Sequence, residues 1–268
     1  MTSSSLTTTR RAALGAFAAA GALAAGGAPL QAQTAQKTFV LIHGTWHGGW
    51  CWRRVAAALQ ARGHKVYAPS LTGLADRSHL LTKDVNLTTH ANDIANLIKW
   101  EDLKDIVLVG HSSAGFAITL AAEQIGPQVA SIVYLDAFVP KVGDSLISLA
   151  NPGPRKALEE AVARGDLVAR PVPSAVFNVN EKDRAWVDAK CTPHPLAAVV
   201  EKMTAAGAYQ KIARKTYIRA TGTKSPVFDE TLAQVKTMPG WTTYEVTSGH
   251  DVMVDQPDRL VEILLEVA

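Results

Sequence analysis

From residue 38 onward, short apolar runs rich in β-branched side chains alternate with segments of helical periodicity. The run at 38–43 is apolar at successive positions, which is typical of a strand buried on both faces of a parallel sheet. In the segment 88–100 apolar residues recur at spacings of three and four, which predicts a helix with one buried stripe. The alternation predicts an α/β fold whose parallel sheet is flanked by helices. The predicted strands are 38–43, 64–68, 105–109, 129–135, 215–220 and 241–246, and the predicted helices are 50–62, 88–100, 113–125, 226 onward and 256–267.

The alternation is interrupted between residues 140 and about 213. This stretch carries many Pro and Gly residues, mixed helical periodicity and no convincing strand. We therefore expect a helical cap inserted into a single domain that covers residues 36–268, because a chain of 268 residues suffices for one large core.

Residues 1–35 differ from the remainder of the chain. A polar Ser/Thr stretch leads to Arg10 and Arg11, and an Ala/Gly-rich apolar run follows at 12–28. This pattern predicts a cleaved twin-arginine export signal and a periplasmic or secreted protein. A membrane anchor or a disordered tail are the alternatives, although the run is shorter than the ~20 apolar residues that a span needs.

Charge and cysteine content exclude several functions. Without Arg10 and Arg11, the 27 basic residues fall to 25 against 24 acidic ones, so a polyanionic partner such as nucleic acid is not expected. The two cysteines, Cys51 and Cys191, have no neighbours at metal-ligand spacing and are interpreted as small core residues. We expect no metal, and a small molecule as the partner.

The candidate chemistry centres on the segment 107–115, where a strand enters a tight turn and then a helix. Ser112 occupies the turn, with Gly110 two residues before it and Ala114 two residues after it, and a nucleophile elbow needs small residues at these places. A serine needs a base, and in this arrangement the base comes last in the chain. His250, directly after the last predicted strand, is preferred to His194, which lies between two prolines.

An oxyanion formed by attack on a carbonyl needs two backbone N–H donors. One belongs to Ser113, which follows the nucleophile, and the other is expected from Thr45 in the glycine-containing loop after the first strand. His43 is a candidate for supporting this loop. Trp46, Phe116, Phe138 and Trp186 are the candidate substrate-binding residues, with Phe177 as a further apolar candidate in the cap.

The segments 43–50, 110–112 and 249–250, in this order and spacing, resemble the plant methylesterase and hydroxynitrile lyase family and its bacterial esterase relatives. The resemblance covers nearly the whole chain after the leader. It implies an α/β-hydrolase fold with about six mainly parallel strands, a small helical cap, no cofactor and a Ser-His-Asp triad.

The third triad member departs from that family. In the plant proteins the acid follows the strand that corresponds to 215–220, but Thr223 stands there in this chain. Asp136, at the end of the preceding strand, matches the place where some haloalkane dehalogenases carry their acid. Asp136 is therefore the preferred acid, and Asp229 is the alternative.

The expected function is hydrolysis of a hydrophobic carboxylic ester through an acyl-enzyme on Ser112. A hydroxynitrile lyase is one alternative, but Gly44 and Asp251 replace the residues that the plant lyases place after the loop histidine and the catalytic histidine. A ligand-binding protein without catalytic activity is the other, because such proteins can keep the whole triad.

Overall fold

The computed structural model describes residues 35–268, so the predicted export signal falls almost wholly outside the described residues. Six strands form one sheet in the order β2-β1-β3-β4-β7-β8, and every neighbouring pair is parallel. This sheet confirms the predicted fold class. The strands are β1 (Thr38–Ile42), β2 (Lys65–Tyr67), β3 (Ile106–His111), β4 (Val129–Leu135), β7 (Arg214–Ala220) and β8 (Trp241–Val246).

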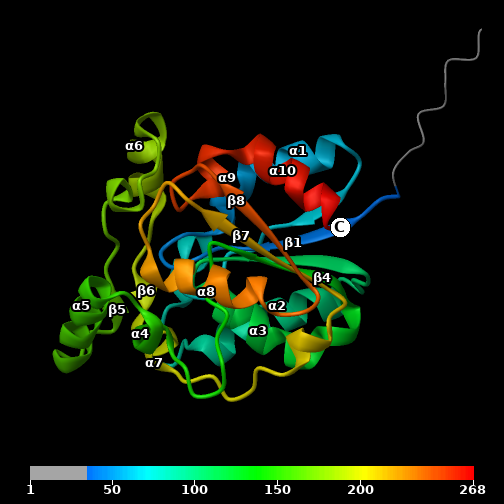
Figure 1. Cartoon of the computed structure of the whole chain (residues 1–268). Coiled ribbons are helices and arrows are strands. Elements are labelled where there is room, and N and C mark those ends of the chain that lie inside the picture. The colour runs from blue at the N-terminus through cyan, green and yellow to red at the C-terminus, as the bar shows by residue number, and fades with distance from the viewer. Residues whose placement is uncertain (1–34) are drawn as a thin grey trace, which may run out of the picture. The chain divides into compact units, whose positions relative to one another are not determined.

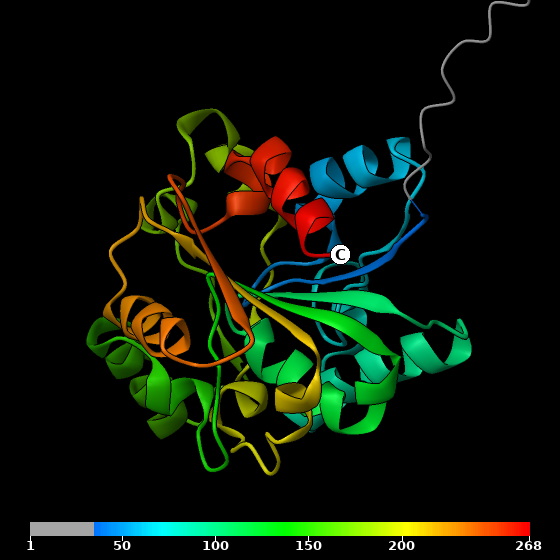
Figure 2. The same ribbon diagram turned by 45° about the vertical axis from the view of Figure 1, so that its right-hand side comes forward.

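Helices cover both faces of the sheet (Figures 1 and 2). One face carries α1 (Arg53–Ala61), α9 (Val252–Asp255) and α10 (Pro257–Glu266), and the other carries α2 (Leu87–Trp100), α3 (Ala114–Ile125) and α8 (Pro226–Lys236). Short 3₁₀ segments complete the body at η1 (Gly49–Trp52), η2 (Ala75–Leu80) and η3 (Gly126–Gln128).

The alternation of side chains along each strand divides the core into two layers. Leu108 of β3 packs with the layer of α2 and α3, whereas Val107 and Val109 pack with the layer of α1 and α10. Successive strand residues point to opposite faces, so a strand between two helical layers must be apolar at almost every position. This requirement explains the continuous apolar runs of the sequence.

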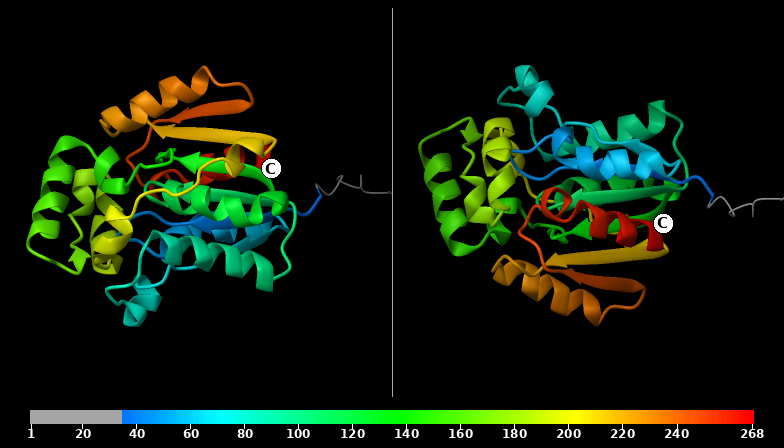
Figure 3. Two further views of the ribbon diagram at one scale, coloured as in Figure 1. Left: turned by 90° about the horizontal axis from the view of Figure 1, so that it is seen from below. Right: turned by 90° about the horizontal axis from the view of Figure 1, so that it is seen from above.

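The segment between β4 and β7 lies beyond the carboxyl ends of the strands, as Figure 3 shows from two sides. It contains a two-residue antiparallel pairing of β5 with β6, where the sequence predicted no strand. Two residues are too few to produce a recognisable periodicity. The elements of this segment are α4 (Leu146–Leu149), α5 (Pro152–Ala163), β5 (Val168–Ala169), η4 (Ser174–Phe177), α6 (Glu181–Lys190), β6 (His194–Pro195), α7 (Leu196–Val200) and η5 (Ala208–Lys211).

Residues 35–268 contain no helix long and apolar enough to cross a membrane.

Candidate active site

Ser112 lies in the turn between β3 and α3 with a left-handed backbone, at φ 56°. A non-glycine residue in this region is strained and marks a site that the surrounding structure holds in place. The turn packs closely on its neighbours: a Cβ added to Gly115 would lie 1.9 Å from the carbonyl oxygen of Phe138. The elbow predicted from the sequence is therefore present, and Gly115 permits its closest backbone approach.

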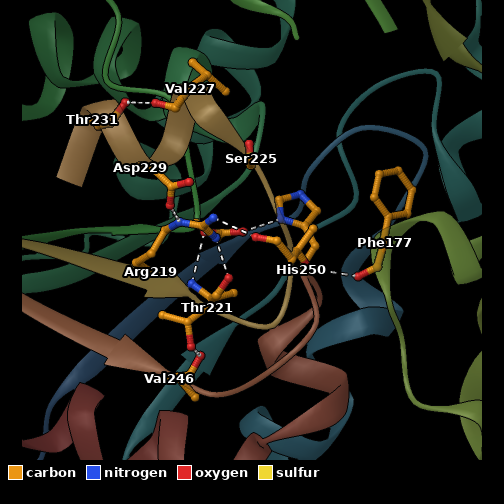
Figure 4. A network of polar contacts seen from close by, with 12 residues as sticks. Phe177, Arg219, Thr221, Ser225, Val227, Asp229, Thr231, Val246 and His250 are labelled. Atoms are coloured by element: carbon orange, nitrogen blue, oxygen red, sulfur yellow. Dashed lines mark hydrogen bonds and ion pairs between the residues drawn. The ribbon is translucent and has the colours of Figure 1, made fainter. Parts of the chain in front are cut away.

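His250 follows β8 and pairs with Asp136 at the end of β4. The distance from His250 Nδ1 to Asp136 Oδ2 is 2.6 Å, and Asp136 is fully buried. A carboxylate only accepts, so the proton between them belongs to Nδ1 and leaves Nε2 free to act as a base. Asp229, the alternative acid, has no hydrogen bond to His250 and instead pairs with Arg219 (Figure 4).

Arg219 was not identified from the sequence, although it contacts the predicted acid directly. Its Nη1 donates to Asp136 Oδ1 at 2.8 Å, and its Nε donates to Asp229 Oδ1 at 2.9 Å. The side chain is only 3% exposed. Burial opposes its charge, but the two carboxylates outweigh burial and raise the pKa of Arg219 above its ordinary value. The signal that could have revealed it was a charged residue between the apolar residues Ile218 and Ala220 of a predicted buried strand.

The oxyanion donors predicted from the sequence are both free to bind. Within residues 35–268, the backbone N–H groups of Thr45 and Ser113 donate no hydrogen bond. The two residues also contact one another, because Thr45 Oγ1 donates to Ser113 Oγ at 2.8 Å. The loop is held close to the nucleophile, since a Cβ on Gly44 would lie 2.8 Å from Ser112 Cβ.

His43 supports this loop, as the sequence suggested. Its Nε2 accepts from the Leu71 N–H at 3.0 Å, so the proton lies on Nδ1, which donates to the Gly44 carbonyl at 2.9 Å. Burial lowers the pKa of His43 to about 3. The ring is therefore neutral, and both of its nitrogens are used to fix the loop.

A second His-Asp pair lies beside the site and was also not predicted. Asp251 is fully buried, and its Oδ2 is 3.0 Å from His47 Nε2. Burial lowers the pKa of His47, but the Asp251 carboxylate outweighs it, so the pKa is raised. His47 Nδ1 donates to the Thr45 carbonyl at 2.8 Å, and the pair thereby links the oxyanion loop to the loop of His250.

The catalytic loops and the cap enclose a cavity of about 560 Å³. Ser112 and His250 line its floor, and Trp46, Phe138 and Phe177 contribute apolar walls, as expected from the sequence. Small residues of α5 such as Ala157 form the opposite wall. A space of this size suits a small organic molecule with a bulky apolar part.

Two of the predicted pocket residues do not line this cavity. Phe116 is buried behind Phe138, with 5.6 Å between the ring centroids. Trp186 packs against Trp50 at 5.0 Å, and the guanidinium group of Arg53 lies 5.0 Å from its ring. The ring therefore packs at the junction of α6 with the body of the domain, between an aromatic ring and a cation.

The cap is bound directly to the catalytic loops. The His250 N–H donates to the Phe177 carbonyl at 2.9 Å (Figure 4). A Cβ on Gly249 would lie 2.2 Å from the Asn178 carbonyl oxygen, so glycine permits this approach. On the other side, Trp46 Nε1 donates to the Ala169 carbonyl at 2.9 Å.

Residues 35–268 contain no cluster of three or more His, Cys, Asp or Glu side chains that could hold a metal ion. Cys51 and Cys191 are free thiols, the first buried and the second partly buried.

Comparisons with known proteins agree with this geometry. The model of the alpha/beta hydrolase family matches residues 39–263. A carbendazim hydrolyzing esterase of a Nocardioides species is 40% identical, over 84% of this chain and 97% of the relative. Methylesterase 7 of Arabidopsis thaliana is 35% identical, over 41% of this chain and 43% of its own length.

Among solved structures, an extracellular alpha/beta-hydrolase of a Paenibacillus species, described as sharing structural and functional homology with tobacco salicylic acid binding protein 2, superposes with a TM-score of 0.76. It is 25% identical, over 87% of this chain and 99% of that one. These relationships confirm the predicted activity, hydrolysis of a carboxylic ester by a serine hydrolase. The chain belongs to the alpha/beta hydrolase family.

Proposed function

We propose that Ser112 is the nucleophile, His250 its general base and Asp136 the acid that orients His250. The observation that carries this assignment is the 2.6 Å contact between Asp136 Oδ2 and His250 Nδ1, made by two residues 114 positions apart. It supports a triad with the acid on β4, one strand away from its place in the plant relatives. The free N–H groups of Thr45 and Ser113 support their role as the oxyanion hole.

In this mechanism His250 Nε2 removes the hydroxyl proton of Ser112 while Oγ attacks the ester carbonyl carbon. The oxyanion accepts hydrogen bonds from the Thr45 and Ser113 N–H groups, and Asp136 stabilises the imidazolium. Collapse breaks the bond to the alcohol oxygen, which takes the proton from Nε2 and leaves an acyl-enzyme on Oγ. Water, deprotonated by His250 Nε2, then attacks the acyl carbon. The bond from the acyl carbon to Ser112 Oγ breaks, Oγ recovers the proton from Nε2, and the carboxylic acid is released.

Ser112 and His250 share the cavity floor but are not hydrogen-bonded to each other in this structure. Such contacts are often long without substrate and tighten in the Michaelis complex.

The substrates we propose are esters with an apolar group that fills the cavity. Carbamate esters are included, because a relative at 40% identity is named for hydrolysing carbendazim, an aromatic methyl carbamate. The apolar walls contributed by Phe138, Phe177 and α5 favour an aromatic or branched group. A lyase reaction gains no support, because Asp251 after the catalytic histidine is buried against His47 and offers no cation to cyanide.

The assignment is tested by treating the protein with a fluorophosphonate and mapping the adduct by mass spectrometry. We expect one adduct, on Ser112, and none in Ser112→Ala, whose kcat should fall by about 10⁴-fold or more while its thermal transition is retained. Hydrolysis of p-nitrophenyl esters and of carbendazim then defines the acyl and alcohol groups. A labelled residue other than Ser112, or full activity of Ser112→Ala, would contradict the mechanism.

Export through the twin-arginine route is part of the proposal and rests on residues 1–35 alone. Replacing Arg10 and Arg11 together with Lys should retain the enzyme and its activity in the cytoplasm, because this route requires the arginine pair. Fractionation of cells that produce either form measures the effect. Normal export of the double variant would point to another route.

A further inference from the structure

Arg219 lies in a position that ordinary packing does not explain. It stands near the end of β7, between β4 and the edge strand β8, where its neighbours Ile218 and Ala220 are fully buried and apolar. A buried guanidinium group is costly unless its donors are satisfied. All three of its nitrogens are used: Nε and Nη1 contact the carboxylates of Asp229 and Asp136, and Nη2 donates to the Thr223 carbonyl at 2.7 Å.

These contacts form a continuous chain of charges that ends at the catalytic base. The order is Asp229, Arg219, Asp136 and His250, with successive contacts of 2.9, 2.8 and 2.6 Å. Acidic and basic groups alternate along it. When His250 takes the proton of Ser112, the chain becomes two anions and two cations, so the new charge is balanced without moving any group.

We propose that Arg219 is a positioning residue for the reaction, which holds the Asp136 carboxylate with one oxygen toward His250, and that Asp229 balances its charge. The inference rests on the proposed roles of Asp136 and His250. Asp136 Oδ1 accepts from both Arg219 Nη1 and the Ala220 N–H, the latter at 3.0 Å. With that oxygen occupied, Oδ2 is the only one available to the imidazole.

Arg219 also offsets part of the Asp136 charge that faces His250, 2.8 Å from one carboxylate oxygen while His250 lies 2.6 Å from the other. Without the cation, the full charge of Asp136 acts on the imidazole and favours its protonated form, which cannot accept a proton from Ser112. Without Asp229, the cation is less compensated and opposes that form. The two removals therefore act in opposite directions on the same histidine, although both break contacts of one chain.

The test compares kcat/KM against pH for Arg219→Met and Asp229→Asn, with p-nitrophenyl acetate as substrate. For Arg219→Met we expect kcat to fall about 10- to 100-fold at pH 7, with KM nearly unchanged. The acid limb of the pH profile, where kcat/KM falls as the pH is lowered, should move up by about one pH unit. For Asp229→Asn we expect a small shift of a few tenths of a unit to lower pH, because the side chain of Asp229 is 62% exposed and screened by solvent.

The other titratable groups around His250 stay in place in both variants. They are His111 at the end of β3, whose Nε2 lies 3.0 Å from the His250 carbonyl, and Asp251, which remains paired with His47. Burial lowers the pKa of His111 well below its ordinary value, so this ring stays neutral in the range of the assay. The opposite shifts therefore report the charge chain and no other group.

Arg219→Lys provides the conservative variant. Lysine keeps the charge but loses the planar fork, so it should recover most of the acid limb position and only part of kcat. Arg77→Met is the matched control, because it breaks an Arg-Asp contact of 3.3 Å, to Asp93, on α2. It should leave kcat and the pH profile unchanged.

A spectroscopic measurement separates positioning from general loss of structure. The Nδ1–H proton of His250, shared with Asp136, should give a far-downfield proton NMR signal that is lost in Asp136→Asn and displaced in Arg219→Met. If Arg219→Met does not fold, Arg219→Lys and Asp229→Asn still test the direction of the shifts. The inference would be overturned if the acid limb were unshifted in every folded variant, or if it shifted in the same direction in the Arg219 and Asp229 variants. Fluorophosphonate labelling of Ser112 tests the proposed function independently.

Discussion

An asparagine at position 136 would be forced by its neighbours into the orientation that disables His250. The carboxylate accepts on both oxygens: Oδ1 receives two donors, Arg219 Nη1 at 2.8 Å and Ala220 N at 3.0 Å, whereas Oδ2 receives one, His250 Nδ1 at 2.6 Å. Asparagine has one oxygen and one NH₂ group. If the NH₂ group, itself a donor, turned toward Arg219 and Ala220, it would face two other donors in a buried place. Each hydrogen bond left unmade there costs about 1–3 kcal/mol.

The amide oxygen of Asp136→Asn therefore faces Arg219, and its NH₂ donates to His250 Nδ1. This moves the histidine proton to Nε2, where it blocks acceptance of the Ser112 proton. We expect kcat/KM to fall by about 10²–10⁴-fold, which corresponds to about 2.7–5.5 kcal/mol of transition-state stabilisation. Loss of the charged partner of Arg219 should also lower the free energy of unfolding by about 1–3 kcal/mol.

Steady-state kinetics with p-nitrophenyl acetate and thermal unfolding measure the two effects separately. Asp183→Asn is the matched control, because Asp183 is also a buried aspartate bound to an arginine, with 2.6 and 2.7 Å contacts to Arg54. It should lose stability and keep kcat. Wild-type kcat/KM in Asp136→Asn would refute the tautomer argument and the assignment of the acid.

Three further predictions concern packing, pH and substrate size. Gly115→Ala should prevent folding or destabilise the protein by about 3 kcal/mol or more, seen as a lower melting temperature, because the new Cβ would lie 1.9 Å from the Phe138 carbonyl oxygen. The His47–Asp251 pair should stabilise the fold most between about pH 4 and 6.5. Asp251, whose pKa is depressed, contributes stability above its ordinary pKa of 3.8, and this stability is lost as the pH falls through the depressed value. His47, whose pKa is raised, contributes stability below its ordinary pKa of 6.5, and this stability is lost as the pH rises through the raised value. Asp251→Asn should therefore lower the urea midpoint more at pH 5.5 than at pH 9, and an equal loss at both would contradict the pairing. Ala157→Phe should reduce kcat/KM for bulky esters about 10-fold or more and leave acetate esters unaffected, because the new ring fills part of the 560 Å³ cavity. A uniform loss across a panel of esters would show that the bulky group of the substrate binds elsewhere.

The fold was predictable because its requirements are local. Strands between two helical layers must be continuously apolar, and the predicted bounds of β4, which is buried at nearly every position, agree with those observed. Ser112 was predictable for the same reason, since the elbow needs small residues at fixed neighbouring positions. The choice of His250 followed from chain order and from its place directly after the last predicted strand.

Contacts across the fold were harder to predict. Trp186 lies on a helix whose facing direction depends on Arg53, more than 130 positions earlier in the chain, so periodicity could not assign it to core, cavity or junction. The pairing of Asp251 with His47, 204 positions away, could be identified only in the structure. Arg219 was the clearest missed signal. A cation in a buried strand requires acidic partners, and the two candidate triad acids of the sequence, Asp136 and Asp229, are those partners.

The attachment of the cap to His250 restricts how substrates enter and products leave. Because the His250 N–H donates to the Phe177 carbonyl and Gly249 lies against Asn178, a hinge opening of the whole cap would displace His250 as well. Exchange must then use local movement of other cap segments, such as α5, while residues 177 and 178 stay in place. For protein engineering this divides the cap into two regions: mutant libraries on α5 can change substrate range, whereas insertions or loop grafts at 177–178 would alter catalysis together with specificity.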